Sequence, residues 1–150
     1  MGPEKRTGGP PDRAVTAVHR AGHAVIAHLL GHAVIRASLD GVRTRYRHGD
    51  LYAYLCEAAI ALAGPLAEQH YRPTTKAERR ELSREFWHTD LDHARQHIAA
   101  CGIDRRWLTR QVRVLVRALV REHWPTIERV AAALEQHGTL SGGEIDQLIA

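Results

Sequence analysis

The chain has 150 residues, of which 44% are hydrophobic, and this is enough apolar sequence to build the core of one domain. Its formal net charge of +4 is mildly basic, which allows an anionic partner without requiring one. No stretch is long and apolar enough for a membrane span, and the two cysteines form no paired motif. These features argue against a membrane-embedded protein and a disulfide scaffold, and they predict a cytoplasmic protein.

The first predicted elements are a tail, a helix and a small β element. Residues 1–12 are rich in proline and glycine and predict a flexible tail, with a single domain over 13–150. Apolar residues at helical spacing predict a helix over 12–30. An Asp40-Gly41 turn then separates apolar residues from an alternating run that ends at Tyr46. We expect a short β-hairpin or edge strand there.

The middle of the chain is predicted to be helical. A helix over 51–71 contains Gly64-Pro65, which should kink it or divide it in two. The segment 76–86 is charged and only weakly periodic. Thr89 is expected to cap a further helix that ends near Gly102.

The last third predicts a long amphipathic helix over 104–123, a helix from Trp124-Pro125 to about residue 136, and a short final helix capped by Ser141. The apolar face of the long helix is expected to contain Val112, Leu115, Val116, Leu119 and Val120. The fold class is therefore mainly α: a compact helical domain with a small β element between its first two helices.

Residues 19–23, which read HRAGH, carry the clearest chemical signal. On a helix, His19 and His23 project from one face and can bind the same metal ion. In the zinc-peptidase motif H-E-x-x-H a glutamate activates water, but here that position is Arg20. Two histidines do not make a zinc site, and with eleven histidines in the chain such a pair also arises by chance, as His93 and His97 show.

The context of this motif resembles the peptidase domain of the FtsH family, zinc proteases attached to membrane-bound ATPase rings. The segment HRAGHAVIAHLLG is similar to the family's HEAGHAVVA helix. Three further segments match in the family's order: LAGPLAEQ at 62–69, WHTDLDHARQHIAACGI at 87–103, and IERVAAALEQHGTLSGGEIDQLI at 127–149. The resemblance covers about residues 14–149 and implies the compact FtsH-peptidase fold.

This resemblance implies a metal site and a role for one further carboxylate. It makes His19, His23 and Asp90 the ligands of one Zn²⁺ per chain, with a fourth position left for water. Glu68 matches an acidic residue near the site and would orient a ligand histidine. Without the resemblance, Asp90 is equally well a carboxylate at a helix N-terminus, and Glu68 a solvated helix residue.

A second arrangement competes for the same aspartate. Asp90, His93 and His97 fall on one helix face and could form a metal site of their own. Simple exposure of His93 and His97 is the favoured interpretation, because no family pattern supports the alternative.

Arg20 places peptidase chemistry in doubt, because a guanidinium stays protonated and cannot serve as a general base. Three interpretations stay open: a pseudopeptidase that acts as a protein-binding module, an enzyme in which Arg20 holds a substrate anion while Glu68 or another acid is the base, or an inactivating substitution. The favoured hypothesis is a zinc-dependent hydrolase-type enzyme with weakened or altered peptide or amide chemistry, with Glu68 and Arg20 as catalytic candidates.

The expected partners follow from these assignments. The substrate would be a peptide or a small amide or anionic molecule, already unfolded or delivered by another protein. No ATP-binding loop is present in this sequence, and a homo-oligomer stays open. A stripe of arginines on the long helix could meet nucleic acid or an acidic partner, although a solvated face is favoured and nucleic acid is the less favoured partner. The stripe consists of Arg106, Arg110, Arg113, Arg117 and Arg121.

Overall fold

The computed structural model describes residues 12–45 and 51–150, so most of the predicted tail, and Tyr46 of the predicted hairpin, lie outside the described residues. The described chain is mainly α-helical with a small antiparallel sheet, which confirms the predicted fold class. In chain order the elements are α1 (Arg13–Leu29), β1 (Ala33–Ser38), β2 (Gly41–Arg45), α2 (Leu51–Tyr71), α3 (Lys76–Glu85), α4 (His88–Ala100), α5 (Arg105–Glu122), α6 (Trp124–His137), β3 (Thr139–Ser141) and α7 (Gly142–Ile149).

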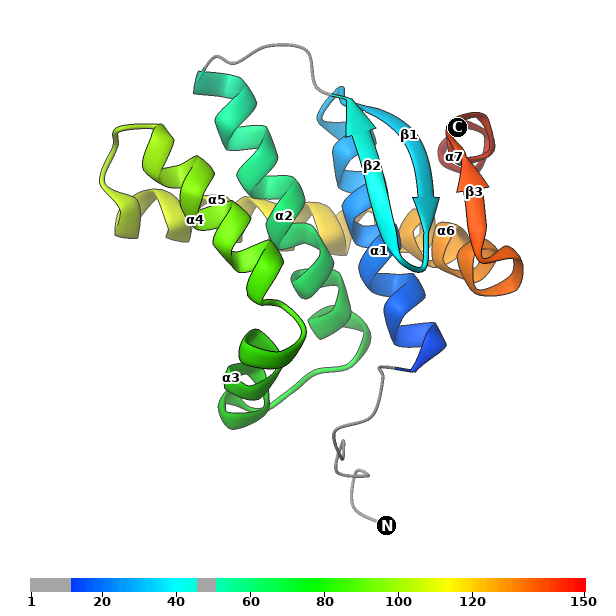
Figure 1. The fold of residues 1–150 in the computed structure, drawn as a ribbon, viewed down its shortest axis with the longest axis horizontal. Coiled ribbons are helices and arrows are strands. Elements are labelled where there is room, and N and C mark those ends of the chain that lie inside the picture. Colours follow the sequence, from blue (N-terminus) through cyan, green and yellow to red (C-terminus); the bar gives the residue numbers. More distant parts are fainter. Residues whose placement is uncertain (1–11, 46–50) are drawn as a thin grey trace.

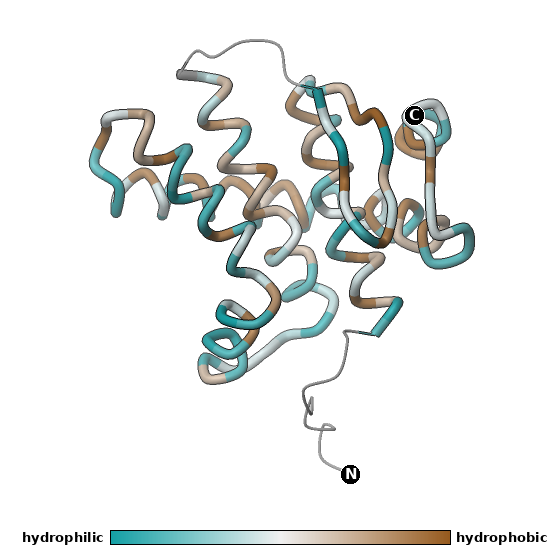
Figure 2. Tube along the Cα trace, viewed as in Figure 1, coloured by the Kyte–Doolittle hydropathy of each residue, from teal (hydrophilic) through white to brown (hydrophobic). Residues whose placement is uncertain are grey.

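Helix α1 is the centre of the fold. It packs against α2 on one side and α6 on another, and the sheet contacts it as well, as Figure 1 shows. Helix α2 in turn packs against α4 and α5. Most of α1 from Val15 to Ala27 is buried, because alanine, glycine and valine allow neighbouring helices to approach closely. Hydrophobic segments gather on the inward faces of these helices in Figure 2.

The sheet contains the predicted hairpin and one strand that the sequence did not predict. Its order is β2-β1-β3, with both pairs antiparallel. Strand β3 pairs Leu140 with Ala37 of β1, so the end of the chain closes on the first hairpin. Within the described residues, no helix is long and apolar enough to cross a membrane.

Helix α2 runs unbroken through Pro65, so of the two outcomes predicted for Gly64-Pro65, a kink or a division of the helix, the division is wrong. A proline removes one amide donor from the helix, but α2 still packs against α1 and α4 as one continuous helix. The contact with α1 is very close at Gly22, where an added Cβ would lie 2.6 Å from the Cβ of Ala67 and 2.7 Å from the carbonyl oxygen of Ala63.

Two local predictions are wrong. Thr89 does not cap α4, which begins at His88, two residues before the start that a Thr89 cap predicts, and has Trp87 at the N-cap position without a side-chain hydrogen bond. Leu115 is 51% exposed, so it is not part of the buried face of α5, which Val112, Val116 and Val120 form.

The weakly periodic segment 76–86 is a helix, α3, because Thr75 and Glu78 form a capping box at its start. The predicted capping by Ser141 is confirmed.

Candidate metal centre

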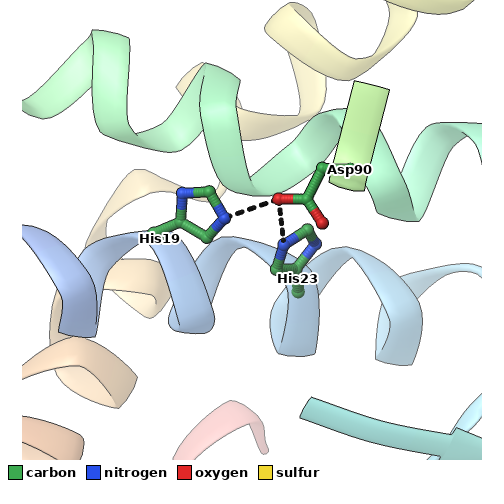
Figure 3. A group of neighbouring side chains, drawn as sticks. All are labelled: His19, His23 and Asp90. Atoms are coloured by element: carbon green, nitrogen blue, oxygen red, sulfur yellow. Dashed lines mark hydrogen bonds and ion pairs between the residues drawn. The ribbon is translucent and has the colours of Figure 1, made fainter. Parts of the chain in front are cut away.

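The structure brings His19, His23 and Asp90 together where α1 meets the first turn of α4. The Nε2 atom of His19 lies 2.7 Å from Oδ2 of Asp90, and Nε2 of His23 lies 3.2 Å from the same oxygen. Figure 3 shows both imidazoles and the carboxylate pointing toward one another. One ligand atom from each residue lies within 4.8 Å of the others, a spacing that fits three ligands of a single ion.

Burial of the two histidines requires an explanation, since polar side chains are rarely buried without partners. His19 is 7% exposed and His23 is 6% exposed. They lie one turn apart on the face of α1 that meets α2, and Asp90 of α4 contacts both of them. Desolvation of two imidazoles is costly unless each ring nitrogen is matched by a partner, and the neighbouring helices provide those partners.

Each histidine has a second partner on its other ring nitrogen. Nδ1 of His23 lies 2.6 Å from the carbonyl oxygen of Ile60, so it donates a hydrogen bond and leaves the lone pair of Nε2 for another group. Nδ1 of His19 lies 3.4 Å from Oε1 of Glu68, while the indole N–H of Trp87 donates to Oε2 of Glu68 at 3.1 Å. Such outer partners fix the orientation and tautomer of metal-binding histidines.

The space between the two Nε2 atoms depends on Gly64 of α2. A Cβ at this position would lie 2.6 Å from Nε2 of His19 and would also collide with Nε2 of His23. Only glycine therefore leaves room beside both nitrogen atoms. Two neutral imidazoles, one carboxylate and this opening fit a Zn²⁺ ion with a position left for a further ligand.

The electrostatics of the cluster favour a cation. Burial alone would lower the pKa of His19, but hydrogen bonds and charge interactions with Asp90 and Glu68 outweigh burial, and the pKa is raised. Burial would likewise raise the pKa of Asp90, but hydrogen bonds with His19 and His23 outweigh it and hold that pKa well below its usual range. Asp90 is therefore a carboxylate at neutral pH and available to a metal ion.

Arg20 contacts the sheet side of α1 and not the carboxylates of the cluster. Its Nε donates a hydrogen bond to the carbonyl oxygen of Leu39, in the β1–β2 turn, at 3.2 Å. This contact ties α1 to the hairpin and gives the guanidinium a structural partner. Glu68, the other catalytic candidate, directs one oxygen at His19 and the other at Trp87.

The competing histidine pair on α4 has no such surroundings. His93 is exposed and His97 is half-buried, with ring centroids 6.2 Å apart, while Asp90 faces α1. In the part of the chain that the structure describes, His19, His23 and Asp90 are the one group of three His, Cys, Asp or Glu residues arranged closely enough to hold an ion.

Gly64, Trp87 and the Ile60 carbonyl are parts of the site that the sequence interpretation does not recognise. The sequence predicts Gly64 only as a helix breaker, although its place four residues before Glu68 is a signal that it faces the same side of α2. Trp87 is the first residue of the segment 87–103 that resembles the FtsH family, but the sequence interpretation gives its side chain no role. The Ile60 carbonyl has no sequence signal, because any residue offers one.

Comparison with known proteins agrees with the similarity seen in the motifs. No family model matches the chain. The chain is similar to the ATP-dependent zinc metalloprotease FtsH of Thermus thermophilus, with 29% identity over an alignment that covers 99% of this chain. The similarity indicates an FtsH-related region. The chain spans 31% of the length of this relative, and the alignment of 194 positions exceeds the 150 residues, so the relative has insertions within it.

Proposed function

We propose that the chain is a zinc-binding, FtsH-peptidase-like domain that holds one Zn²⁺ through His19, His23 and Asp90. The observation that carries the proposal is the meeting of these three side chains beside Gly64, where a Cβ would fill the space. The choice of metal is supported by the similarity to the Thermus protein, which is named as a zinc metalloprotease. The resemblance is expected to extend to a single domain over residues 13–150.

A bound zinc ion at this position supplies a Lewis acid that polarises a carbonyl group or a water molecule. The protein's own contribution is to orient the ligands. Glu68 holds His19 through Nδ1, the Ile60 carbonyl holds His23 through Nδ1, and Trp87 holds Glu68 in place. Each contact directs an Nε2 atom toward the shared space near Asp90.

Proton transfer is the step for which the chain is poorly equipped. Arg20 stands where the peptidase motif has glutamate, and its guanidinium cannot accept a proton at any working pH. Both oxygens of Glu68 are directed at His19 and Trp87, on the far side of His19 from Asp90. Loss of a general base typically costs about 10²- to 10⁴-fold in rate. We therefore propose that amide hydrolysis is weak or lost, and that the domain acts mainly as a zinc-stabilised pseudopeptidase.

Restoration of the motif tests this proposal. We compare the zinc-reconstituted parent with Arg20→Glu and with Arg20→Gln, which removes the charge without supplying a carboxylate. Hydrolysis of a fluorescent unfolded casein substrate is the readout. We expect a gain of about 10²-fold or more in Arg20→Glu only.

Two results would contradict the proposal. Equal hydrolysis by the parent and Arg20→Glu would mean that another residue already serves as the base. Turnover by the parent that both variants lose would assign Arg20 a positive role in altered chemistry. Zinc content is measured in all three proteins, so that a failure to bind metal is distinguished from a failure of catalysis.

A further inference from the structure

Two neighbouring grooves on the α3–α4–α5 side of the molecule are lined by basic residues. The first lies along α4 and α5 and is lined by Arg95, Ile98, Arg105, Arg106, Thr109 and Arg110. The second lies between α2, α3 and α5, and its basic residues are Lys76, Arg79, Arg80, Arg84 and Arg113. We call the two grooves together the basic surface. Among the described residues that line it, none is acidic.

The positive charges of the basic surface are crowded and only partly compensated. Arg95 pairs with Asp92 at 3.0 Å, on an exposed turn of α4. Burial, together with repulsion from Arg117 and Arg95, holds the pKa of the Arg113 guanidinium below its usual range. Arg110 of the first groove and Arg113 of the second lie about one turn apart on α5, so the two grooves adjoin. An anionic ligand here would relieve repulsion among cations.

The floor of the surface is apolar, and so is its outer edge on α5. Ile98 lies in the first groove, and Leu62, Leu66 and Leu91 lie in the second. Trp107 and Val114 lie beside the arginine stripe of α5 and are 51% and 61% exposed. They are separated by two helical turns, so they lie on the same side of the helix. Arginine next to exposed aromatic and aliphatic side chains is the composition enriched in protein interfaces.

We propose that the basic surface binds an acidic segment of a partner protein in which carboxylates alternate with apolar side chains. The guanidinium fork matches a carboxylate with two parallel hydrogen bonds, and the apolar floor accepts side chains such as leucine. A nucleic-acid backbone fits less well, because Glu81 and Glu85 on α3 and Asp92 on α4 are exposed beside the grooves and interrupt a continuous track of phosphates. The proposal does not depend on zinc.

The test uses a fluorescein-labelled synthetic peptide of Glu, Asp and Leu at helical spacing, with binding followed by fluorescence anisotropy. The two probes for comparison are a peptide with Gln and Asn in place of Glu and Asp, and a poly-thymidine oligonucleotide. The matched variants are Arg110→Glu/Arg113→Glu on the basic surface and Arg43→Glu/Arg45→Glu on β2. Each pair of substitutions reverses two charges, and circular dichroism checks that each variant is folded.

We expect the acidic peptide to bind the parent and the β2 variant, to weaken steeply with salt, and to lose about tenfold or more in affinity in Arg110→Glu/Arg113→Glu. The neutral peptide should bind far less. The proposal is wrong if both variants weaken binding equally, if the acidic peptide does not bind at low salt, or if the oligonucleotide binds more tightly than the peptide.

Discussion

Two pairs of histidines in this chain have the same helical spacing but differ in their burial and in the groups that surround them. His19 and His23 lie on the buried face of α1, against α2 and α4, and point at Asp90. His93 and His97 lie on α4, where His93 faces solvent. The spacing brings two imidazoles to one side of a helix in both cases. The difference is that neighbouring helices provide the first pair with a carboxylate and with partners for the outer nitrogens.

The largest expected effect separates the two pairs directly. His19→Ala removes a proposed zinc ligand and should therefore lower zinc affinity by more than about 100-fold, which is more than the loss of a partner that only orients a ligand usually costs. His97→Ala, which removes the matching member of the other pair, should leave the affinity unchanged. Competition with a chromogenic zinc chelator measures both. Similar losses in the two variants would contradict the proposed site, because His97 would then contribute to zinc binding as much as His19 does.

A substitution that removes no ligand sharpens the comparison. Gly64→Ala should weaken zinc binding by about 10- to 100-fold, because an added methyl group overlaps Nε2 of both histidines and overpacking typically costs about 1–3 kcal/mol. Gly143→Ala on α7 is the matched control, since a Cβ there meets only Ser141 Oγ at 3.9 Å. Unchanged zinc affinity in Gly64→Ala, in a folded protein, would place the ion elsewhere.

The smallest expected effect concerns the outer partner of His19. Glu68→Gln keeps the shape of the side chain but removes its charge, and zinc affinity should fall about tenfold, at the low end for such partners. Glu57→Gln is the control on the same helix, because Glu57 lies 3.6 Å from Nδ1 of His32 and does not contact His19. If both variants bind zinc as the parent does, Glu68 has no orienting role.

The same contrast shows what the sequence can predict. Many helix bounds follow from local signals, and the capping residue Ser141 lies where the sequence places it. The capping box of Thr75 and Glu78 can also be recognised in the sequence, although the charged segment after it lacks the apolar periodicity that would predict a helix. Thr89 is a good capping residue by type, but it lies inside α4, whose N-cap position is held by the buried Trp87 two residues earlier.

The sequence predicts only those residues of the candidate site whose side-chain type itself indicates metal binding. His19, His23 and Asp90 are candidates from the motif and its resemblance, and the fold brings them together. The role of Gly64 depends on a different helix lying against it, and the role of the Ile60 carbonyl depends on backbone alone. The short strand β3 likewise exists only because β1 is already in place to pair with it. These features are products of tertiary packing and leave little trace in local sequence.

X-ray absorption spectroscopy of the zinc-reconstituted parent, combined with elemental analysis, tests the central claim most directly. We predict about one zinc per chain and a first coordination shell of nitrogen and oxygen atoms, with the scattering of two imidazole rings. A chain that retains no zinc after reconstitution would contradict the proposed metal centre. So would a zinc ion bound through sulfur, because this would assign the metal to Cys56 or Cys101 and not to His19, His23 and Asp90.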